Sequence, residues 1–107
     1  MGALLAAALP RGLMDSRTWR NLRPSARALF VEIALGYDGK NDGRVRLSHR
    51  EAAFAIHSGL ATAVRAFAEL EQAGLIRRSG RERVASRWTI VHLSNDAVGN
   101  APKLKAA

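Results

Sequence analysis

Cysteine is absent from this 107-residue chain, and its absence excludes several classes of protein at once. Without a thiol, the chain has no disulfide framework, no cysteine-based zinc finger and no thiol nucleophile. This fits a reducing compartment, so we expect a cytoplasmic protein. A chain of this length can bury a core without such staples, and one compact domain is expected.

Acidic residues are also scarce, with 9 Asp and Glu against 17 Lys and Arg and a formal net charge of +8. This balance favours a polyanionic partner, because each phosphate contact releases condensed counterions. Nucleic acid is the first expectation and an anionic membrane surface the second. The apolar residues 1–10 lack a basic start and are too short to cross a bilayer. We therefore interpret residues 1–14 as an N-terminal arm and expect no membrane partner.

Aromatic residues make up only 6% of the chain, and the two tryptophans occupy apolar positions. Trp88 shares a strand face with Ile90, and Trp19 belongs to a short apolar helix, so both are expected in the core. Binding of RNA or single strands by stacking needs exposed aromatic rings. That mode of binding is therefore disfavoured.

Residue patterns for catalysis or metal binding are lacking as well. No carboxylate pair, nucleophile with a base, or phosphate-binding glycine loop is found, and His49, His57 and His92 are widely spaced. Residues 38–43 faintly resemble a calcium loop, but Lys40 holds a ligand position and His49 stands where a bidentate glutamate must close the site. We expect no enzyme, no cofactor, no metal and no small-molecule substrate.

Two helices are expected in the first third of the chain. One covers Asp15–Leu22, with Asp15 or Ser16 as its cap and with Trp19 turned inward beside Leu22. Another begins at Pro24 and stops near Gly36, where residues 38–43 have the composition of a turn. Its inward positions follow the i, i+3, i+4, i+7 spacing: Ala26, Leu29, Phe30, Ile33, Ala34 and Tyr37.

A strand and two closely spaced helices follow. Residues 44–47 alternate charged and apolar, which predicts a strand with Val45 and Leu47 inward. Ser48 and Glu51 form a capping box that opens a helix through Ile56. After the break at residues 57–59, residues 60–73 predict a second helix, which Gly74 ends. Its inward stripe is Ala63, Ala66, Phe67 and Leu70, and its outward face carries Ala61, Arg65, Ala68, Glu69 and Gln72.

The C-terminal third predicts a basic hairpin and a tail. Residues 75–78 and 84–91 are expected to be strands joined by a turn. This hairpin contains five arginines and one acidic residue, Glu82, so its net charge is strongly positive. The composition after His92 cannot bury enough surface to fold, so residues 93–107 are expected to be a flexible tail.

This order of elements resembles that of a winged helix-turn-helix domain. Residues 62–76 resemble the recognition helix and first wing strand of bacterial winged-helix regulators, most clearly in the ending ELEQAGLI. Residues 9–53 resemble winged-helix proteins of proteobacterial prophages and mobile elements. The resemblance implies an α+β winged helix over residues 15–92 that binds double-stranded DNA. It departs from the usual pattern at Gly59, where a Ser or Thr cap is common, and Ser58 is the alternative cap.

The resemblance also implies a set of DNA-contacting residues. A recognition helix lays its first turns in the major groove, so Arg65 is expected to read guanine, with Thr62 beside it and Ala61 placed to meet a thymine methyl. The start of the preceding helix would hold a phosphate, and the hairpin would lie along the DNA backbone. Those further residues are Ser48, His49, Arg50, Ser58, Arg77, Arg78, Arg81 and Arg83.

Transcriptional regulation is the leading role under this interpretation. A replication or recombination accessory protein of a mobile element is an alternative that the residues do not separate from it. A third possibility is a winged helix that serves as a protein-interaction module, with its basic face on an acidic partner. A homodimer on a two-fold DNA site is expected to use the apolar residues 3–14, unless these fold onto their own domain.

Overall fold

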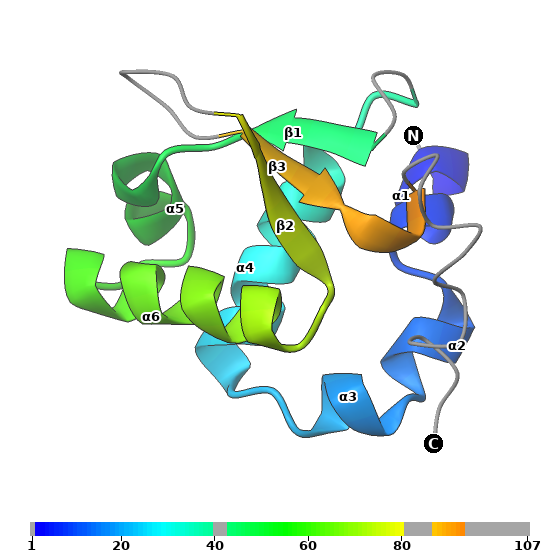
Figure 1. The fold of residues 1–107 in the computed structure, drawn as a ribbon, viewed down its shortest axis with the longest axis horizontal. Helices are drawn as coiled ribbons and strands as arrows, with labels where there is room; N and C mark the ends of the chain where they lie inside the picture. Colours follow the sequence, from blue (N-terminus) through cyan, green and yellow to red (C-terminus); the bar gives the residue numbers. More distant parts are fainter. Residues whose placement is uncertain (1, 40–42, 81–86, 94–107) are drawn as a thin grey trace.

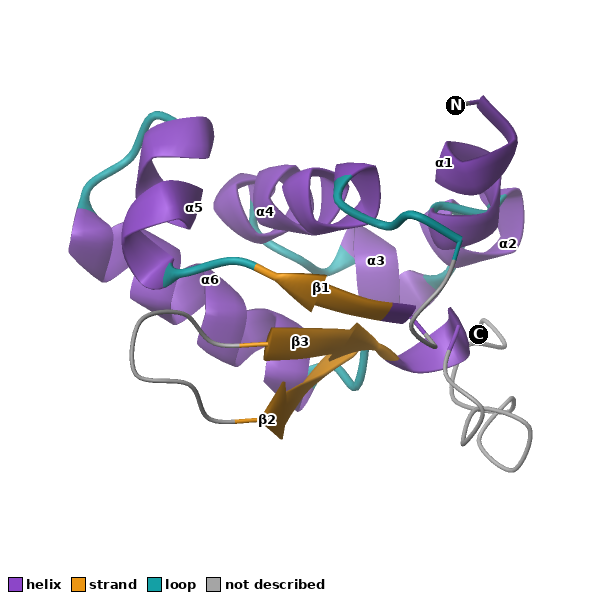
Figure 2. Ribbon diagram, turned by 90° about the horizontal axis from the view of Figure 1, so that it is seen from above, coloured by secondary structure: helices purple, strands orange, loops and turns teal. Residues whose placement is uncertain are grey.

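The computed structural model describes residues 2–39, 43–80 and 87–93. Within these ranges the chain folds as an α+β protein, in which helices pack against a small antiparallel sheet of three strands. In Figure 1 the sheet crosses the upper part of the molecule, and α5 and α6 lie together at one end. Helix α4 lies behind β2 and β3 in Figure 1, and Figure 2 shows it on the side of the sheet where β1 lies.

The N-terminal segment forms short helices packed on the fold. These helices are α1 (Gly2–Ala8), α2 (Arg11–Met14) and α3 (Arg17–Arg20). Ala8 and Leu13 are buried, and α1 packs against α4 and the C-terminal turn. Where the composition led us to expect an arm, residues 2–14 are therefore built onto the same core.

Ser16 sets the start of α3. Its Oγ accepts a hydrogen bond from the Trp19 amide at 3.1 Å and donates one to the Leu13 carbonyl at 2.6 Å. The helix expected over Asp15–Leu22 is thus shorter at both ends, because Ser16 and not Asp15 is the cap and Asn21 ends the turn. Trp19 and Leu22 are buried, as predicted.

Helix α4 (Pro24–Leu35) lies behind the sheet in Figure 1, and its bounds match the sequence prediction closely. Proline stands in its first turn, and Gly36 is its C-cap. The inward face is buried at Ala26, Leu29, Phe30, Ile33 and Ala34, whereas Tyr37 is only partly buried. The Trp19 ring meets Phe30 edge-on at 5.6 Å, which fixes α3 against α4.

Strand β1 (Arg44–Arg46) leads into α5 (His49–Ala55) through the predicted capping box. The Ser48 hydroxyl accepts from the Glu51 amide at 3.0 Å, and the Glu51 carboxylate accepts from the Ser48 amide at 2.9 Å. Val45 is buried, and Leu47 packs against the core. On α5 the buried residues are Ala52 and Ala53, with Ile56 partly buried beside them.

Four residues, Ile56 to Gly59, separate α5 from α6 (Leu60–Gln72), and His57 adopts a left-handed φ of 54°. The predicted stripe of α6 is buried: Ala63, Ala66, Phe67 and Leu70. Gly74, with φ of 79°, ends the helix. Its amide donates to Glu71 while the Leu75 amide donates to Leu70, which is the paired bonding of a Schellman cap.

The sheet joins strands far apart in the sequence. Strand β3 (Arg87–Ile90) lies between β1 and β2 (Ile76–Gly80), and both pairings are antiparallel. Val45 is opposite Trp88, and Ile76 is opposite Ile90, so these apolar residues share the inner face. Residues 81–86, which include part of the predicted turn and second strand, lie outside the described residues.

A 3-10 turn, η2 (Val91–Leu93), follows β3 where the sequence suggested a strand as far as Val91. Gly43 makes room for it, because a Cβ at this glycine would lie 2.9 Å from Leu93 Cβ and 3.0 Å from the Ile90 carbonyl oxygen. Leu93, the first residue of the expected tail, packs on the core. The remainder of that tail, residues 94–107, lies outside the described residues.

Candidate nucleic-acid interface

The outer face of α6 is the candidate reading surface. Ala61, Arg65, Ala68 and Gln72 are exposed there, as the helical spacing predicted, and Thr62 is partly exposed. Nη2 of Arg65 lies 3.4 Å from Oγ1 of Thr62, to which it donates a long hydrogen bond. The structure thus brings Thr62 and Arg65 together one turn apart, on a helix whose opposite face is buried.

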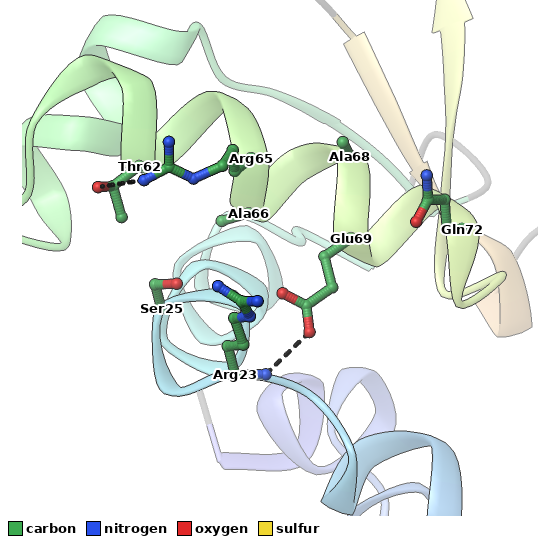
Figure 3. Close-up of a pocket in the computed structure, with 8 residues that line it drawn as sticks. All are labelled: Arg23, Ser25, Thr62, Arg65, Ala66, Ala68, Glu69 and Gln72. Carbon is green, nitrogen blue, oxygen red and sulfur yellow. Dashed lines mark hydrogen bonds between the residues drawn. The ribbon is translucent and has the colours of Figure 1, made fainter.

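A groove runs beside this face. It lies between the start of α4 and α6, with a volume of about 410 Å³, and Figure 3 shows the side chains around it. Its lining residues are Arg23, Ser25, Thr62, Arg65, Ala66, Ala68, Glu69 and Gln72. The α4 side of the groove was missed at the sequence level, because no local pattern indicates which helix packs beside α6.

Glu69 crosses this groove, although the helical spacing placed it on the outer face. Its carboxylate accepts a hydrogen bond from the Arg23 backbone amide at 2.8 Å (Figure 3). That amide stands at the N-cap position of α4, which has no side-chain cap of its own. The bond therefore ties α6 to the start of α4 and fixes the width of the groove between them.

The residues at the start of α5 have largely structural contacts. The hydroxyl and the amide of Ser48 are both used in the capping box. These bonds hold the pKa of Glu51 below its ordinary value of 4.5, chiefly through the Ser48 amide. Arg50 is exposed, and of the three predicted phosphate contacts at this point it is the most accessible.

His49 belongs to an aromatic cluster under the sheet. Its ring meets Phe67 edge-on at 4.9 Å, and Phe67 stacks on Trp88 at 4.4 Å. Trp88 Nε1 donates to the Leu47 carbonyl at 3.0 Å, and the guanidinium of Arg78 lies 5.0 Å from the centre of the Trp88 ring. The structure thus gathers His49 and Arg78 around one indole, where both contribute to packing.

The other predicted residues lie apart from that cluster. Arg77 is exposed and pairs in register with Thr89, so it faces the side of the sheet opposite to Arg78. Arg81 and Arg83 lie outside the described residues. Ser58 does not cap α6, because its hydroxyl donates to the Gly59 carbonyl at 3.0 Å, and Gly59 itself is the N-cap.

Apolar side chains are also exposed on α5 and α6. Phe54 is 84% exposed, Leu60 48% and Val64 41%. Leu60 and Val64 are one turn apart on α6 and flank Ala61. These residues make the outer surface of the helix pair less polar than the basic composition of the chain suggests.

Comparisons of the chain with protein-family models, with curated proteins and with solved structures found no match. Among the residues that the structure describes, no three or more His, Asp and Glu side chains are grouped so that they could hold a metal ion. In the same residues, none of the helices has the length and apolar character that a membrane crossing requires.

Proposed function

We propose that this protein is a winged helix-turn-helix domain that binds double-stranded DNA. In this proposal α5 and α6 are the helix-turn-helix, and the hairpin between β2 and β3 is the wing. One observation carries it: α6 is seated on the body by a small and apolar stripe, while Thr62 and Arg65 project from its exposed side. A helix of this kind fits the major groove of B-form DNA.

Arg65 is assigned the main role in reading sequence. A guanidinium can donate two parallel bonds to the O6 and N7 atoms of guanine, and such a pair discriminates by about 1–3 kcal/mol against the wrong base. The contact with Thr62 limits the conformations of this long side chain before DNA arrives. Ala61, one turn earlier, is small enough to contact a thymine methyl group.

Sequence-specific binding of this kind suits transcriptional regulation, in which the domain blocks or recruits other proteins at a promoter. A replication or recombination accessory protein of a mobile element would use the same surface. Catalysis and cofactors have no part in either role. The proposal includes a homodimer on a two-fold DNA site. Ala8 and Leu13 do not belong to the dimer interface, because both are buried within the chain.

The test is selection of bound fragments from random duplex DNA, followed by titration of the selected site at several salt concentrations. We expect a defined sequence to emerge and its affinity to fall steeply with salt. Arg65→Ala should lose the preference for one base pair while retaining binding to random duplex. Arg11→Ala is the matched control, because Arg11 is the first residue of α2, where it pairs with the C-cap residue Asp15, and α2 lies at the far end of the molecule from α6 (Figures 1 and 2).

A protein-interaction module is the second candidate, and the exposure of Phe54 favours it. An aromatic ring that is 84% exposed has no role in the DNA-binding proposal and is a common anchor in protein interfaces. Phe54→Ser separates the two candidates. If DNA binding is the function, this variant retains duplex affinity; if the wild-type chain binds no duplex at any salt concentration, the interaction module replaces the DNA-binding proposal.

A further inference from the structure

The junction between α3 and α4 carries a dense group of arginines that the proposed reading surface does not include. Arg17, Arg20, Arg23 and Arg27 fall within residues 16–31, which contain no acidic residue. Arg17, Arg20 and Arg23 are exposed. Among the described residues, none of these three guanidinium groups forms an ion pair.

Two hydrogen bonds hold this junction beside α6. The Arg23 amide donates to Glu69 at 2.8 Å, which fixes the start of α4 to the last turn of α6. Arg27 Nη2 donates to the Arg20 carbonyl at 2.7 Å, which fixes the end of α3 to α4. The backbone that bears Arg20 and Arg23 is therefore set in a defined position relative to α6.

The groove between α4 and α6 has a cation on each side. Arg23 and Ser25 line it from α4, whereas Thr62 and Arg65 line it from α6, as Figure 3 shows. Of the described residues that line it, only Glu69 is acidic, and its carboxylate accepts the Arg23 amide. The two arginines outnumber this carboxylate, so the lining keeps a net positive charge that attracts a polyanion lying along the groove.

We infer that this arginine junction is a second DNA-contacting surface, which holds one phosphodiester strand of the duplex that α6 enters. The inference rests on the proposed function and extends it by assigning phosphate contacts to Arg20 and Arg23. The strand lies along the groove, with Arg23 on the α4 side and the hydroxyl of Thr62 on the other, and it continues past the groove to Arg20 at the end of α3. Such contacts set the orientation of α6 on the duplex and do not depend on base sequence.

We expect substitutions in the arginine junction and in α6 to change DNA binding in different ways. For B-form DNA, log affinity falls with log salt by about 0.9 for each phosphate that the protein neutralises. The double variant Arg20→Ala with Arg23→Ala should reduce this slope by about 0.9 per lost contact and weaken all duplex sequences alike. Arg65→Ala should instead relax the base preference.

The experiment compares wild type, the double variant, Arg65→Ala and the control Arg11→Ala on the selected duplex and on a scrambled duplex. The double variant keeps both backbone groups that fix the junction, because the Arg23 amide and the Arg20 carbonyl remain. A thermal melt checks this folding, and the charge-preserving pair Arg20→Lys with Arg23→Lys should restore most of the salt slope.

The outcomes separate the two hypotheses. If wild type binds duplex and Arg65→Ala alters its preference, but the double variant has an unchanged slope, the arginine junction takes no part and only this inference fails. If wild type does not bind duplex, the proposed function fails as well. A reduced slope that the lysine pair restores supports the phosphate contacts.

Discussion

The carboxylate of Glu69 accepts a hydrogen bond at 2.8 Å from the backbone amide of Arg23, 46 positions earlier in the sequence, and so joins α6 to the start of α4. One acidic side chain thereby caps α4 and also lines the groove beside the candidate reading face. The same residue therefore affects stability and the local charge of the surface. The cap stabilises the fold that presents α6, whereas the negative charge of the carboxylate opposes the approach of DNA. Substitutions at this position can separate the two effects.

Glu69→Ala should lower the free energy of unfolding by about 1 kcal/mol, the usual cost of removing a side-chain cap. Glu69→Gln should cost less, because an amide oxygen can still accept from the Arg23 amide. Urea denaturation of both variants measures the difference. Equal stability of wild type and Glu69→Ala would contradict the capping role.

Glu69→Gln should also bind duplex DNA more tightly than wild type, since it removes a negative charge from a groove lined by Arg23 and Arg65. Titration of a random duplex at low and at high salt measures this gain, which should shrink as salt rises. Glu71→Gln, at an exposed position on α6 outside the groove lining, is the matched control. A gain as large in the control would show that net charge, and not the groove, governs affinity.

Arg78→Ala should lower the free energy of unfolding by about 0.5–1 kcal/mol, because the guanidinium no longer covers the Trp88 ring. Trp88 is fully buried, stacks on Phe67 and donates to Leu47, so it should remain in place. Chemical denaturation followed by fluorescence checks the loss. Arg50→Ala, at an exposed position on α5, should leave stability unchanged and serves as the comparison.

His92 should make stability depend on pH. Burial holds its pKa below the ordinary value of 6.5, against the opposing effect of its bond to the Ala7 carbonyl. Nε2 is directed to that carbonyl at 3.1 Å, and Nδ1 is buried with no partner among the residues that the structure describes, so a second proton on the ring would have no such acceptor. The unfolded chain therefore binds a proton more readily than the folded chain.

The contribution of His92 is thus fully present above pH 6.5 and is lost as pH falls from 6.5 through the lower pKa of the folded state. Denaturation midpoints measured between about pH 8 and about pH 5 should fall toward acid. His92→Gln retains a donor for the Ala7 carbonyl but does not titrate, and it should flatten the curve over this range. An equally steep curve in the variant would assign the effect to other groups.

Gly74→Ala should destabilise the fold by roughly 1–2 kcal/mol, the cost of placing a Cβ in the left-handed conformation. The φ of 79° at this position belongs to the Schellman cap that turns the chain from α6 into β2. A thermal melt measures the loss. Gly12→Ala is the control, because a Cβ there would meet no atom of the described part of the chain within 4 Å.

Local signals explain why parts of the fold were predictable. The Ser48 and Glu51 capping box and the Gly74 stop depend on residues a few positions apart, and both formed as expected. The apolar stripe ending in Leu70 likewise follows from helical spacing alone. Such features can be read from sequence because the partners that satisfy them are neighbours in the chain.

The parts of the fold and of the candidate site that were not predicted depend on tertiary contacts that no local sequence pattern encodes. Helices as short as α1 and α2 do not form in isolation, so the packing that buries Ala8 and Leu13 determines them. Within the candidate site, spacing predicted that Arg65 is exposed, but it could not show that Arg23 lies across a groove from it. The structural roles of His49 and Arg78 also became visible only once Trp88 was placed between them.

The position of β3 between β1 and β2 has a consequence for synthesis of the protein on the ribosome. Arg44 pairs with Thr89, so the first strand has no neighbour until nearly the whole described chain has emerged from the exit tunnel. The helix pair can close earlier, because α5 and α6 are adjacent in sequence. A nascent chain stalled before Arg87 should therefore expose two unsatisfied strand edges and be susceptible to proteases, whereas a chain that has passed Ile90 should be protected.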